Sequence, residues 1–328
     1  MEERLLLVET HVINPSDSPM LVSILIDNYN YDRFLCDAID SALGQTYPHV
    51  EVVVTDDGST DDSRAIIAGY GDRIVPVYKE NGGQPSAFNA GFIACRGDLI
   101  CFLDADDVFH EDKVAELVAF ARKKTRTVTD VHIYDKVECI DGDGNPLDVP
   151  PPLPYRSHPA NMYQYAKKYG YVPFLSSPTS GIAITRSLAE RLFPLPSVGG
   201  SADDYLVRGA LLIGEVHGIN KVLTKYRIHG KNRWYTNRPQ RSEELFSVEK
   251  AYLNAKLIAS GRQPTISFFE STLARDYYLY HRSRKGLVRL AFTMLRQRPG
   301  LAIVAFAVKT LFFALFLPKR PSSQPNRE

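Results

Sequence analysis

Short apolar runs alternate with segments of helical spacing over the first hundred residues of the chain. Leu21–Ile26 and Leu99–Leu103 are continuous apolar runs, and Val50–Thr55 is rich in β-branched residues. Runs of this length are typical of strands that are buried on both faces of a sheet. Between them, Tyr31–Leu43 and Ser86–Cys95 have the spacing of helices. This alternation with short connections predicts a doubly wound α/β fold, with a mostly parallel sheet and helices on both faces.

The later part of the chain predicts a second half of the same domain, followed by a helical carboxyl-terminal region. Strand character returns at Gly181–Thr185 and Val222–His229, a helix is expected over Asp203–Ile213, and helical spacing dominates from Ser242 onward. The proline-rich segment Val149–Tyr155 separates the two halves. The predicted organisation is an extension over 1–20, a domain over 21–240 with halves 21–148 and 149–240, a helical region over 241–300, and an apolar helix with a tail over 301–328.

An apolar segment near the carboxyl end predicts contact with a membrane. Leu301–Leu317 contains a single charge, Lys309, and basic residues flank it on both sides. Its length is at the short limit of the roughly 17–25 residues that span a bilayer. We expect it to span or lie on the membrane, with the protein at the cytoplasmic face; the alternative is a helix buried on the domain or in a homo-oligomer interface.

Composition and charge exclude several classes of protein. A hydrophobic fraction of 44%, a charged fraction of 23% and a net charge of +1 are typical of an ordinary globular protein and give no argument for a nucleic-acid partner. The four cysteines form no CxxC pair, which is typical of reduced core residues in a cytosolic protein. The acidic amino terminus does not resemble a secretory signal.

Three carboxylates follow the predicted strand Leu99–Leu103 within four residues: Asp104, Asp106 and Asp107. Side by side they would repel one another, so they need a counter-charge. A divalent cation such as Mg²⁺ or Mn²⁺ prefers oxygen ligands and would supply it. The alternative is an acidic turn in which Asp107 caps a helix that begins at Val108.

Further polar groups follow the neighbouring strands or begin helices. Asp27–Asn30 ends the first strand, Asp56–Ser59 ends the second, and the turn Asn81–Gly83 precedes the helix over Ser86–Cys95. The carboxyl ends of parallel strands meet at one edge of a sheet, where open α/β folds bind ligands. These segments and Asp104–Asp107 are therefore expected to line one crevice.

In this order the motifs resemble those of the family 2 glycosyltransferases of the GT-A fold. The resemblance is dense over Leu21–Val108 and looser over Ser177–His229. The matching residues are Val22-Ser23-Ile24, Tyr29-Asn30, Gln45-Thr46-Tyr47, Asp56 to Thr60, Asn81-Gly82-Gly83 and Leu103 to Asp107. The chain departs from the family pattern at Asp27, where the family often has Pro or another small residue.

The resemblance implies an enzyme that transfers a hexosyl group from a nucleotide-sugar donor, of the UDP or dTDP type, to a hydroxyl acceptor on a cell-surface glycan or lipid. It implies Mn²⁺ or Mg²⁺ as cofactor, an inverting single displacement, and Asp203 as catalytic base with Asp204 as the alternative. The His of the Tyr226–His229 element is placed to reach the metal. Implied metal ligands are Asp104, Asp106, Asp107 and His229; implied donor-binding residues are Asp27, Tyr29, Asp57, Asn81, Gly82, Asp104 and Arg227.

Other interpretations stay open at this stage. Ser201 or Asp203 alone is also typical of a helix N-cap. An inactive nucleotide-sugar binding module or a nucleotidyltransferase of related fold is the alternative function, whereas a dehydrogenase is disfavoured because no GxGxxG follows the first strand. The segment Asp141–Pro146 is interpreted as a turn, since it lacks the Gly and Glu of a calcium loop.

Overall fold

The computed structural model describes residues 19–151, 159–170, 172, 177–197, 201–230, 232, 243–266 and 308. The predicted extension falls outside these ranges up to residue 18. The apolar segment Leu301–Leu317 also falls outside them, apart from Val308. Trp234 and Tyr235, which follow the Tyr226–His229 element, are not among the described residues either.

A nine-stranded sheet runs through the described residues, in the order β3-β2-β1-β4-β8-β6-β9-β5, with β7 paired to β6. The strands are β1 (Val22–Asn28), β2 (Val50–Asp56), β3 (Val75–Tyr78), β4 (Leu99–Asp104), β5 (Val108–Phe109), β6 (Val131–Ile140), β7 (Pro146–Leu147), β8 (Ile182–Thr185) and β9 (Glu215–Arg227).

The sheet is parallel over its first four strands and mixed over the rest. Strands β3, β2, β1 and β4 are parallel neighbours, in the doubly wound arrangement that the alternating pattern predicts. Strand β8 then runs antiparallel to both β4 and β6, whereas β6 and β9 are parallel to each other. Because β8 lies between β4 and β6, the two predicted halves share one continuous sheet.

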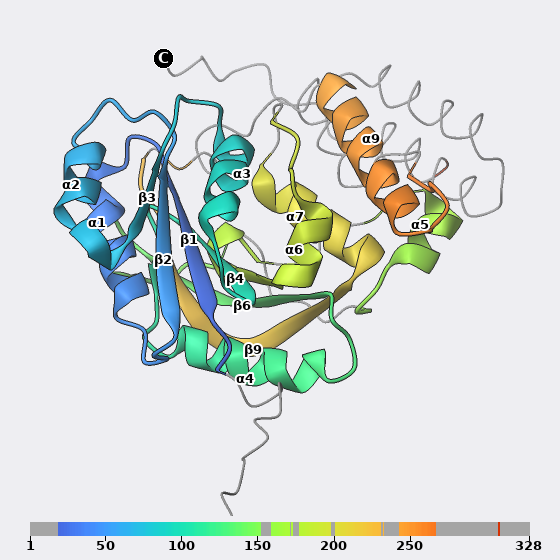
Figure 1. The fold of residues 1–328 in the computed structure, drawn as a ribbon, viewed down its shortest axis with the longest axis horizontal. Helices are drawn as coiled ribbons and strands as arrows, with labels where there is room; N and C mark the ends of the chain where they lie inside the picture. The colour runs from blue at the N-terminus through green and yellow to red at the C-terminus, as the bar shows by residue number, and fades with distance from the viewer. Residues whose placement is uncertain are drawn as a thin grey trace, which may run out of the picture.

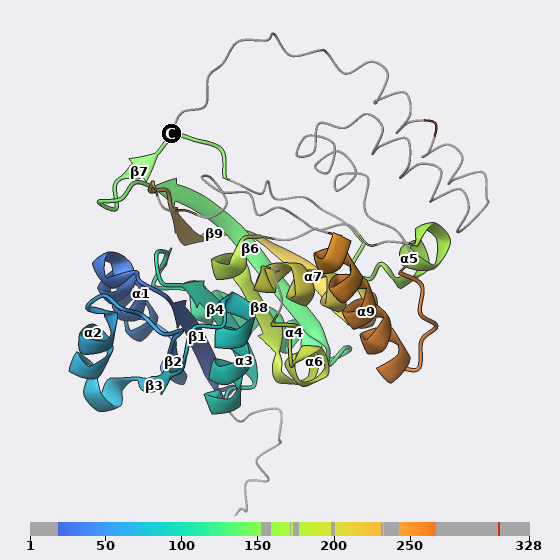
Figure 2. The ribbon, with the colours of Figure 1, turned by 90° about the horizontal axis from the view of Figure 1, so that it is seen from above.

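Helices cover both faces of this sheet, as Figures 1 and 2 show. Helices α1, α2 and α4 pack on one face, and α3, α6, α7 and α9 contribute to the core of the other. Their bounds are α1 (Asp32–Leu43), α2 (Ser63–Gly69), α3 (Gln84–Ala94), α4 (Lys113–Thr125), α5 (Tyr163–Tyr169), α6 (Arg186–Leu192), α7 (Ala202–Ile213) and α9 (Glu243–Ala259), with 3-10 turns at Gly71–Arg73 and Thr179–Gly181.

The continuous apolar runs supply two hydrophobic cores because successive strand residues point to opposite faces. On β1, Ile24 and Ile26 belong to the core under α1 and α4, whereas Leu25 belongs to the core under α3 and α7. Apolar residues are therefore needed on both faces of β1, and the sequence supplies them at most positions; the buried Ser23 is the exception, and its hydroxyl donates to Glu51. Close packing also explains Gly91 on α3: a Cβ there would lie 2.3 Å from the Leu25 side chain.

Two local expectations have clear outcomes. Val108–Phe109 forms β5, which pairs with β9 through Val108 and Lys225, so Asp107 does not cap a helix at that point. The segment at Asp141 is a turn as expected, since the Asp141 carboxylate accepts hydrogen bonds of 2.9 Å from the backbone N–H groups of Asp143 and Asn145.

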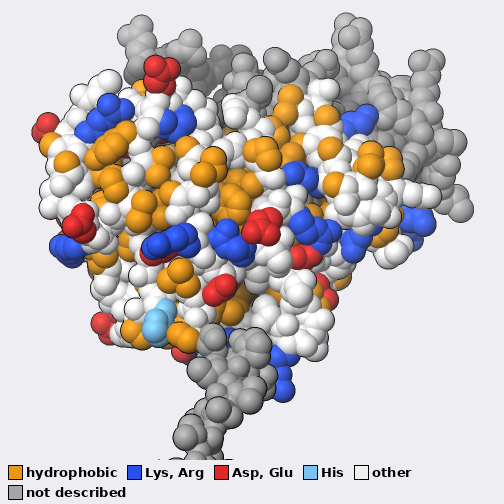
Figure 3. Space-filling view, viewed as in Figure 1, with side chains coloured by type: hydrophobic (Ala, Val, Ile, Leu, Met, Phe, Trp, Pro, Cys, Tyr) orange, Lys and Arg blue, Asp and Glu red, His pale blue; other side chains and the backbone are white. Residues whose placement is uncertain are grey.

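The described surface mixes charges of both signs. On the face drawn in Figure 3, basic, acidic and hydrophobic side chains are interspersed rather than gathered by type. Within the part of the chain that the structure describes, no helix combines the length and the apolar character needed to cross a bilayer.

Candidate functional site

The carboxyl ends of β1, β2 and β4 bring the predicted polar residues together. Asp27 on β1 is in register with Asp104 on β4, and Asn28 is in register with Asp56 on β2. Because parallel strands in register place corresponding side chains on the same face, the carboxylates of Asp27 and Asp104 are neighbours. The convergence expected from the strand ends is therefore present.

Three carboxylates form a compact cluster at the end of β4. One oxygen from each of Asp104, Asp106 and Asp107 lies within 4.8 Å of the others. Burial, followed by the charges of neighbouring aspartates, raises the pKa of Asp104 and of Asp107 well above the usual range. Burial and mutual repulsion therefore oppose ionisation of these carboxyl groups, and a cation that offsets the repulsion would favour it.

The chain holds Asp107 by both of its carboxylate oxygens. Oδ1 accepts a hydrogen bond of 2.8 Å from the backbone N–H of Arg227, and Oδ2 accepts one of 2.5 Å from the Ser180 hydroxyl. Asp107 is 1% exposed. It is thus fixed from two directions by segments more than seventy residues away in sequence.

Arg227 lies beneath the cluster with its guanidinium directed into the protein. Its Nε donates to the Asp106 carbonyl oxygen at 2.9 Å, and NH2 donates to the Asp37 carboxylate at 2.7 Å. NH1 faces the carbonyl oxygens of Asp141 and Gly142, and the side chain is 2% exposed. In the described structure these contacts hold the backbone of the acidic turn, and the donor-binding role expected of Arg227 stays a prediction.

Asp106 receives its partners from the segment after β9. The His229 ring nitrogen Nε2 lies 2.9 Å from Asp106 Oδ2, and the amide of Asn232 lies 3.5 Å from the same oxygen. The His229 ring also packs against Phe34, with centroids 4.8 Å apart. The Tyr226–His229 element therefore reaches the cluster, through the contact between His229 and Asp106.

Gln84, the first residue of α3, connects the cluster to helix α7. Its Nε2 donates to Asp104 Oδ1 at 2.8 Å, and its Oε1 accepts from the backbone N–H of Ala202 at 3.2 Å. Sequence reasoning did not single out this residue, although it directly follows the Asn81–Gly83 turn. Its position directly after a recognised turn is the signal that could have identified it.

Asp27 faces Asp104 in a confined space. Its Oδ1 is buried and has no hydrogen-bond partner among the described residues. Burial is the main cause that raises the pKa of Asp27 to about 7, and the nearby Asp106 charge raises it further. This residue, at which the chain departs from the family pattern, therefore adds a fourth carboxylate at the edge of the cluster.

The candidate base lies at the start of α7. Asp203 is partly exposed, its Oδ1 accepts from the Ser201 hydroxyl and from the backbone N–H of Asp204, and its charge contributes to the raised pKa of Asp104. Asp204 is 9% exposed and lies 3.5 Å from the guanidinium of Arg208. Of the two, Asp203 is the carboxylate that faces the acidic cluster, since its charge acts on Asp104.

Asp57 organises the turn that precedes α3. Its carboxylate accepts from Lys79 Nζ at 2.5 Å and from the backbone N–H groups of Gly82 and Gly83 at 3.0 and 2.7 Å. Gly58 lies so close to this turn that a Cβ would approach Asn81 N to 2.6 Å. The Asp57 carboxylate therefore holds the turn in place, and its expected contact with the donor stays a prediction.

Tyr29, another predicted donor-binding residue, is 45% exposed at the end of β1. It is therefore accessible to a ligand lying over the strand ends. Its phenol ring is not held by the core, unlike that of Tyr31, which packs edge-on against His229 with centroids 5.7 Å apart.

The acidic cluster fits a divalent cation. Mg²⁺ bonds of about 2.1 Å place the ligand oxygens of an octahedral ion roughly 3–4 Å apart. The three oxygens here all lie within 4.8 Å of one another, which is compatible with that geometry. Carboxylate oxygens are also the donor type that Mg²⁺ and Mn²⁺ prefer. Asp107 is the most constrained of the three, so Asp104 and Asp106 are the members best able to turn towards an ion.

Comparisons with known proteins agree with this geometry. A family model described as Glycosyl transferase family 2 matches residues 23–192. An uncharacterized glycosyltransferase of Nostoc sp. is 31% identical over 283 residues, covering 82% of this chain and 85% of that protein. A putative teichuronic acid biosynthesis glycosyltransferase of Bacillus subtilis, TuaG, is 33% identical over 132 residues, covering 39% of this chain and 51% of that protein.

The fold is also found among solved structures. The crystal structure of S. aureus TarS 1-349 in complex with UDP-GlcNAc has a TM-score of 0.55 to this chain, with 16% sequence identity. The match covers 90% of this chain and 81% of the TarS chain. It confirms the α/β architecture of the GT-A type that the sequence motifs predict.

Proposed function

The chain belongs to glycosyl transferase family 2, and we propose that it transfers a hexosyl group from a nucleoside diphosphate sugar to a hydroxyl of its acceptor. The observation that carries the proposal is the joint placement of two features in one crevice. The carboxylate cluster suits a cation, which would in turn hold the diphosphate of the donor. Asp203, a candidate base, lies across from the cluster with Gln84 between them.

We propose that Asp104 and Asp106 hold the metal ion, Mn²⁺ or Mg²⁺, with Asp107 and His229 orienting them. Such an ion would act as a Lewis acid on the departing diphosphate. The support is geometric, because Asp107 is held by Ser180 and Arg227, and His229 contacts Asp106 rather than standing apart from it.

In this proposal Asp203 removes the proton of the acceptor hydroxyl as the glycosidic bond forms. It is partly exposed, whereas Asp204 is engaged with Arg208, which itself pairs with Glu249 at 2.9 Å. A single displacement by the acceptor inverts the anomeric carbon, since the acceptor must attack from the face opposite the diphosphate. Asp203 on the acceptor side and the metal cluster on the other suit that geometry.

The donor that we propose is a UDP- or dTDP-sugar bound over the ends of β1 and β2. Tyr29 is exposed just after β1, Asn81 and Gly82 lie against Gly58 and Asp57 just after β2, and Asp27 is on β1. The complex of TarS with UDP-GlcNAc supports a UDP donor. Because Asp57 is engaged by Lys79 and Gly82, we propose that it acts on the donor by shaping the turn that contacts it.

The acceptor that we propose is a cell-surface glycan or a lipid-linked precursor of one, used at the cytoplasmic face of the membrane. The similarity to TuaG supports a surface polymer, and the apolar segment Leu301–Leu317 supports a membrane-bound acceptor. A homo-oligomeric assembly is compatible with the same segment.

The test is a donor screen on purified protein. Each of a set of UDP-, dTDP- and GDP-sugars is incubated with Mn²⁺, and released nucleoside diphosphate is measured with and without a surface-polymer acceptor. Release from at least one donor, abolished by EDTA and restored by Mn²⁺, is expected.

The matched variant is Asp106→Asn, which removes one cluster charge at nearly constant volume. We expect it to abolish transfer and leave the circular dichroism spectrum unchanged. Binding of a donor without turnover by the wild-type protein would instead indicate the inactive binding module, and full activity of Asp106→Asn in EDTA would exclude the metal site.

A further inference from the structure

Directly behind the acidic cluster, the sheet buries an ion pair that the proposed reaction does not use. The ammonium group of Lys113 lies 2.6 Å from Asp135 Oδ2, and both side chains are 0% exposed. Its two other hydrogen bonds, each of 2.7 Å, go to the Ser180 carbonyl oxygen and the Thr224 hydroxyl. The Thr224 hydroxyl donates in turn to Asp135 Oδ1 at 2.8 Å, so the network is closed on itself.

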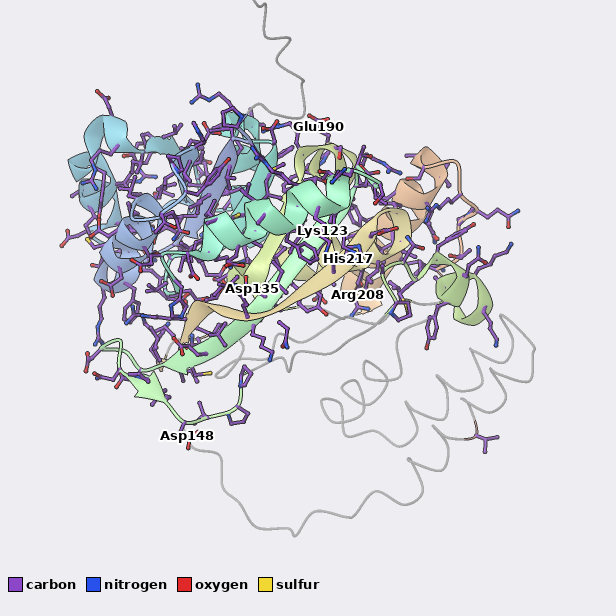
Figure 4. All side chains as sticks on the ribbon, turned by 90° about the horizontal axis from the view of Figure 1, so that it is seen from below. Lys123, Asp135, Asp148, Glu190, Arg208 and His217 are labelled. Carbon is purple, nitrogen blue, oxygen red and sulfur yellow. The ribbon has the colours of Figure 1, made fainter. Side chains whose placement is uncertain are left out.

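These four residues come from four separate elements. Lys113 begins α4, Asp135 is on β6, Thr224 is on β9, and Ser180 is in the 3-10 turn before β8. Figure 4 labels Asp135 on β6, on the side of the sheet that α4 covers. The Lys113 ammonium group therefore links α4 to three other segments that are far apart in the chain.

Stability alone does not account for a buried pair of this kind. Taking both charges out of water costs several kcal/mol per ion, and well-packed apolar replacements are often neutral or stabilising. An apolar pair would serve the core between α4 and β6 equally well. The pair is better explained by a geometric task.

That task is visible at Ser180, which faces the ion pair with its carbonyl and the cluster with its hydroxyl. The hydroxyl donates to Asp107 Oδ2 at 2.5 Å and accepts from the backbone N–H of Asp104 at 3.1 Å. Lys113 thus holds the turn through the Ser180 carbonyl oxygen, and the Ser180 hydroxyl contacts both Asp104 and Asp107.

We propose that the Lys113–Asp135 pair is a positioning device that fixes Ser180, and through it the spacing of Asp104 and Asp107 for a divalent cation. The inference rests on the proposed metal-dependent transfer and assigns residues to it that touch neither substrate nor metal. Partners of metal-binding carboxylates typically change metal affinity by about 10–100-fold when they are removed.

The decisive variant is the double substitution Lys113→Met with Asp135→Leu, which removes both charges together. Thr224 retains an acceptor in the Ser180 carbonyl oxygen, 3.2 Å away, so no buried donor is orphaned. Removal of Lys113 alone would leave a buried, uncompensated carboxylate and is expected to unfold the protein. Ser180→Ala, which cuts the link without touching the ion pair, is the second variant.

The matched control is a surface ion pair that also involves α4: Lys221 on β9 and Glu116 on α4, which are 2.6 Å apart. Lys221→Met with Glu116→Gln removes charges from α4 and β9 without reaching the cluster. The thermal midpoint of each variant, measured in EDTA, reports stability separately.

Binding of Mn²⁺ alone is measured by calorimetry on the full chain, together with turnover of the donor found in the screen. We expect the Mn²⁺ dissociation constant to rise about tenfold or more in both variants. The double variant should keep a thermal midpoint close to that of the wild type. Ser180→Ala should stay folded with a lower midpoint, because Asp104 N–H and Asp107 Oδ2 lose a partner. The control variant should bind Mn²⁺ as the wild type does.

The outcomes separate the two proposals. Unchanged Mn²⁺ affinity in Ser180→Ala or in a folded double variant, beside a wild type that binds Mn²⁺ and turns over donor, overturns the positioning role alone. A wild type that turns over donor without binding Mn²⁺ overturns the positioning role and the metal site. A wild type that binds Mn²⁺ but uses no donor overturns the proposed transfer, and the affinities still decide the positioning role.

Discussion

Single carboxylates in the crevice differ sharply in how the chain engages them. Asp107 accepts hydrogen bonds at both oxygens, and Asp106 is within hydrogen-bond distance of His229. Asp204 forms an ion pair with Arg208, whereas Asp203 faces the cluster from the start of α7. Their different surroundings assign different tasks to chemically identical groups, because neighbours decide how freely a carboxylate moves and what charge it carries.

Replacement of Asp203 by Asn should remove the base and little else. General-base catalysis is typically worth about 10²–10⁴-fold, so kcat for transfer should fall by about that factor while the KM for the donor changes little. Asp204→Asn is the neighbouring control and should have a smaller effect. If Asp204→Asn alone abolishes transfer, the base is one residue further along, and a product that retains the donor's anomeric configuration would rule out the single displacement.

Asp27 should make the metal-free protein less stable as the pH rises. Its pKa in the folded state is about 7, above the ordinary value of 3.8, so the folded state binds more protons than the unfolded state between these values. Its contribution is complete below about pH 4 and is lost as the pH rises through 7. Thermal unfolding in EDTA should therefore show a midpoint that falls from pH 5 to pH 8.

Asp27→Asn supplies the comparison for that measurement, because an amide of the same shape does not titrate. Its midpoint in EDTA should fall less between pH 5 and pH 8 than that of the wild type. Parallel curves for the two proteins would show that Asp27 is not a source of the pH dependence.

Among the elements, α3 has a larger role than its sequence suggests. Gln84 at its first turn links Asp104 to Ala202, and Asn89 binds both the N–H and the carbonyl oxygen of Leu195 at 2.7 and 2.8 Å. One helix thus fastens the segment that leads into α7 and the start of α7 itself. The position of the candidate base relative to the cluster depends on these amides.

Gln84→Ala should lower kcat about 10-fold or more, since misplacement of a reacting group by about 1 Å can cost up to 10²-fold. The lost hydrogen bonds should cost only about 1 kcal/mol each in the free energy of unfolding. Gln84→Glu keeps an acceptor for Ala202 but removes the donor to Asp104, so comparing kcat of the two variants shows which contact matters. Wild-type kcat in both would exclude the link.

Over the whole molecule, one sheet carries both halves of the crevice. The ends of the parallel strands carry Asp27, Asp57 and the acidic cluster. Strand β9 supplies Arg227 next to that cluster, and α7 supplies Asp203 across from it. Because β8 joins β4 to β6, the two halves are hydrogen-bonded as a single layer. We therefore expect the described part to keep the site's geometry without large movements between halves.

The segment after that layer should decide whether the protein associates with membranes. Leu301–Leu317 is apolar with basic flanks, and buried apolar side chains favour the bilayer by roughly 0.3–0.6 kcal/mol each on the insertion scale. Truncation after Pro299 should move the protein from the membrane fraction to the supernatant and abolish flotation with liposomes. A full-length protein that needs no detergent and does not float would identify the segment as a core or interface helix.

Much of the fold follows from local patterns that the sequence contains. Apolar runs located β1, β2 and β4, because strands buried on both faces need mostly apolar side chains. Helical spacing of apolar residues located α1 and α3. The order of polar motifs at strand ends predicted that these residues converge, because parallel strands end at a common edge. Asp104, Asp106 and Asp107 were identifiable for the same reason.

The tertiary structure alone decided which groups meet across long stretches of chain. Val108–Phe109 became a strand because β9 pairs with it, more than a hundred residues later. Arg227 turned inward to Asp106 and Asp37, and Lys113 became the buried partner of Asp135, although neither differs in sequence from an exposed basic residue. A hydrogen bond or an ion pair depends on distances between side chains, and periodicity along one segment carries no information about what another segment brings to it.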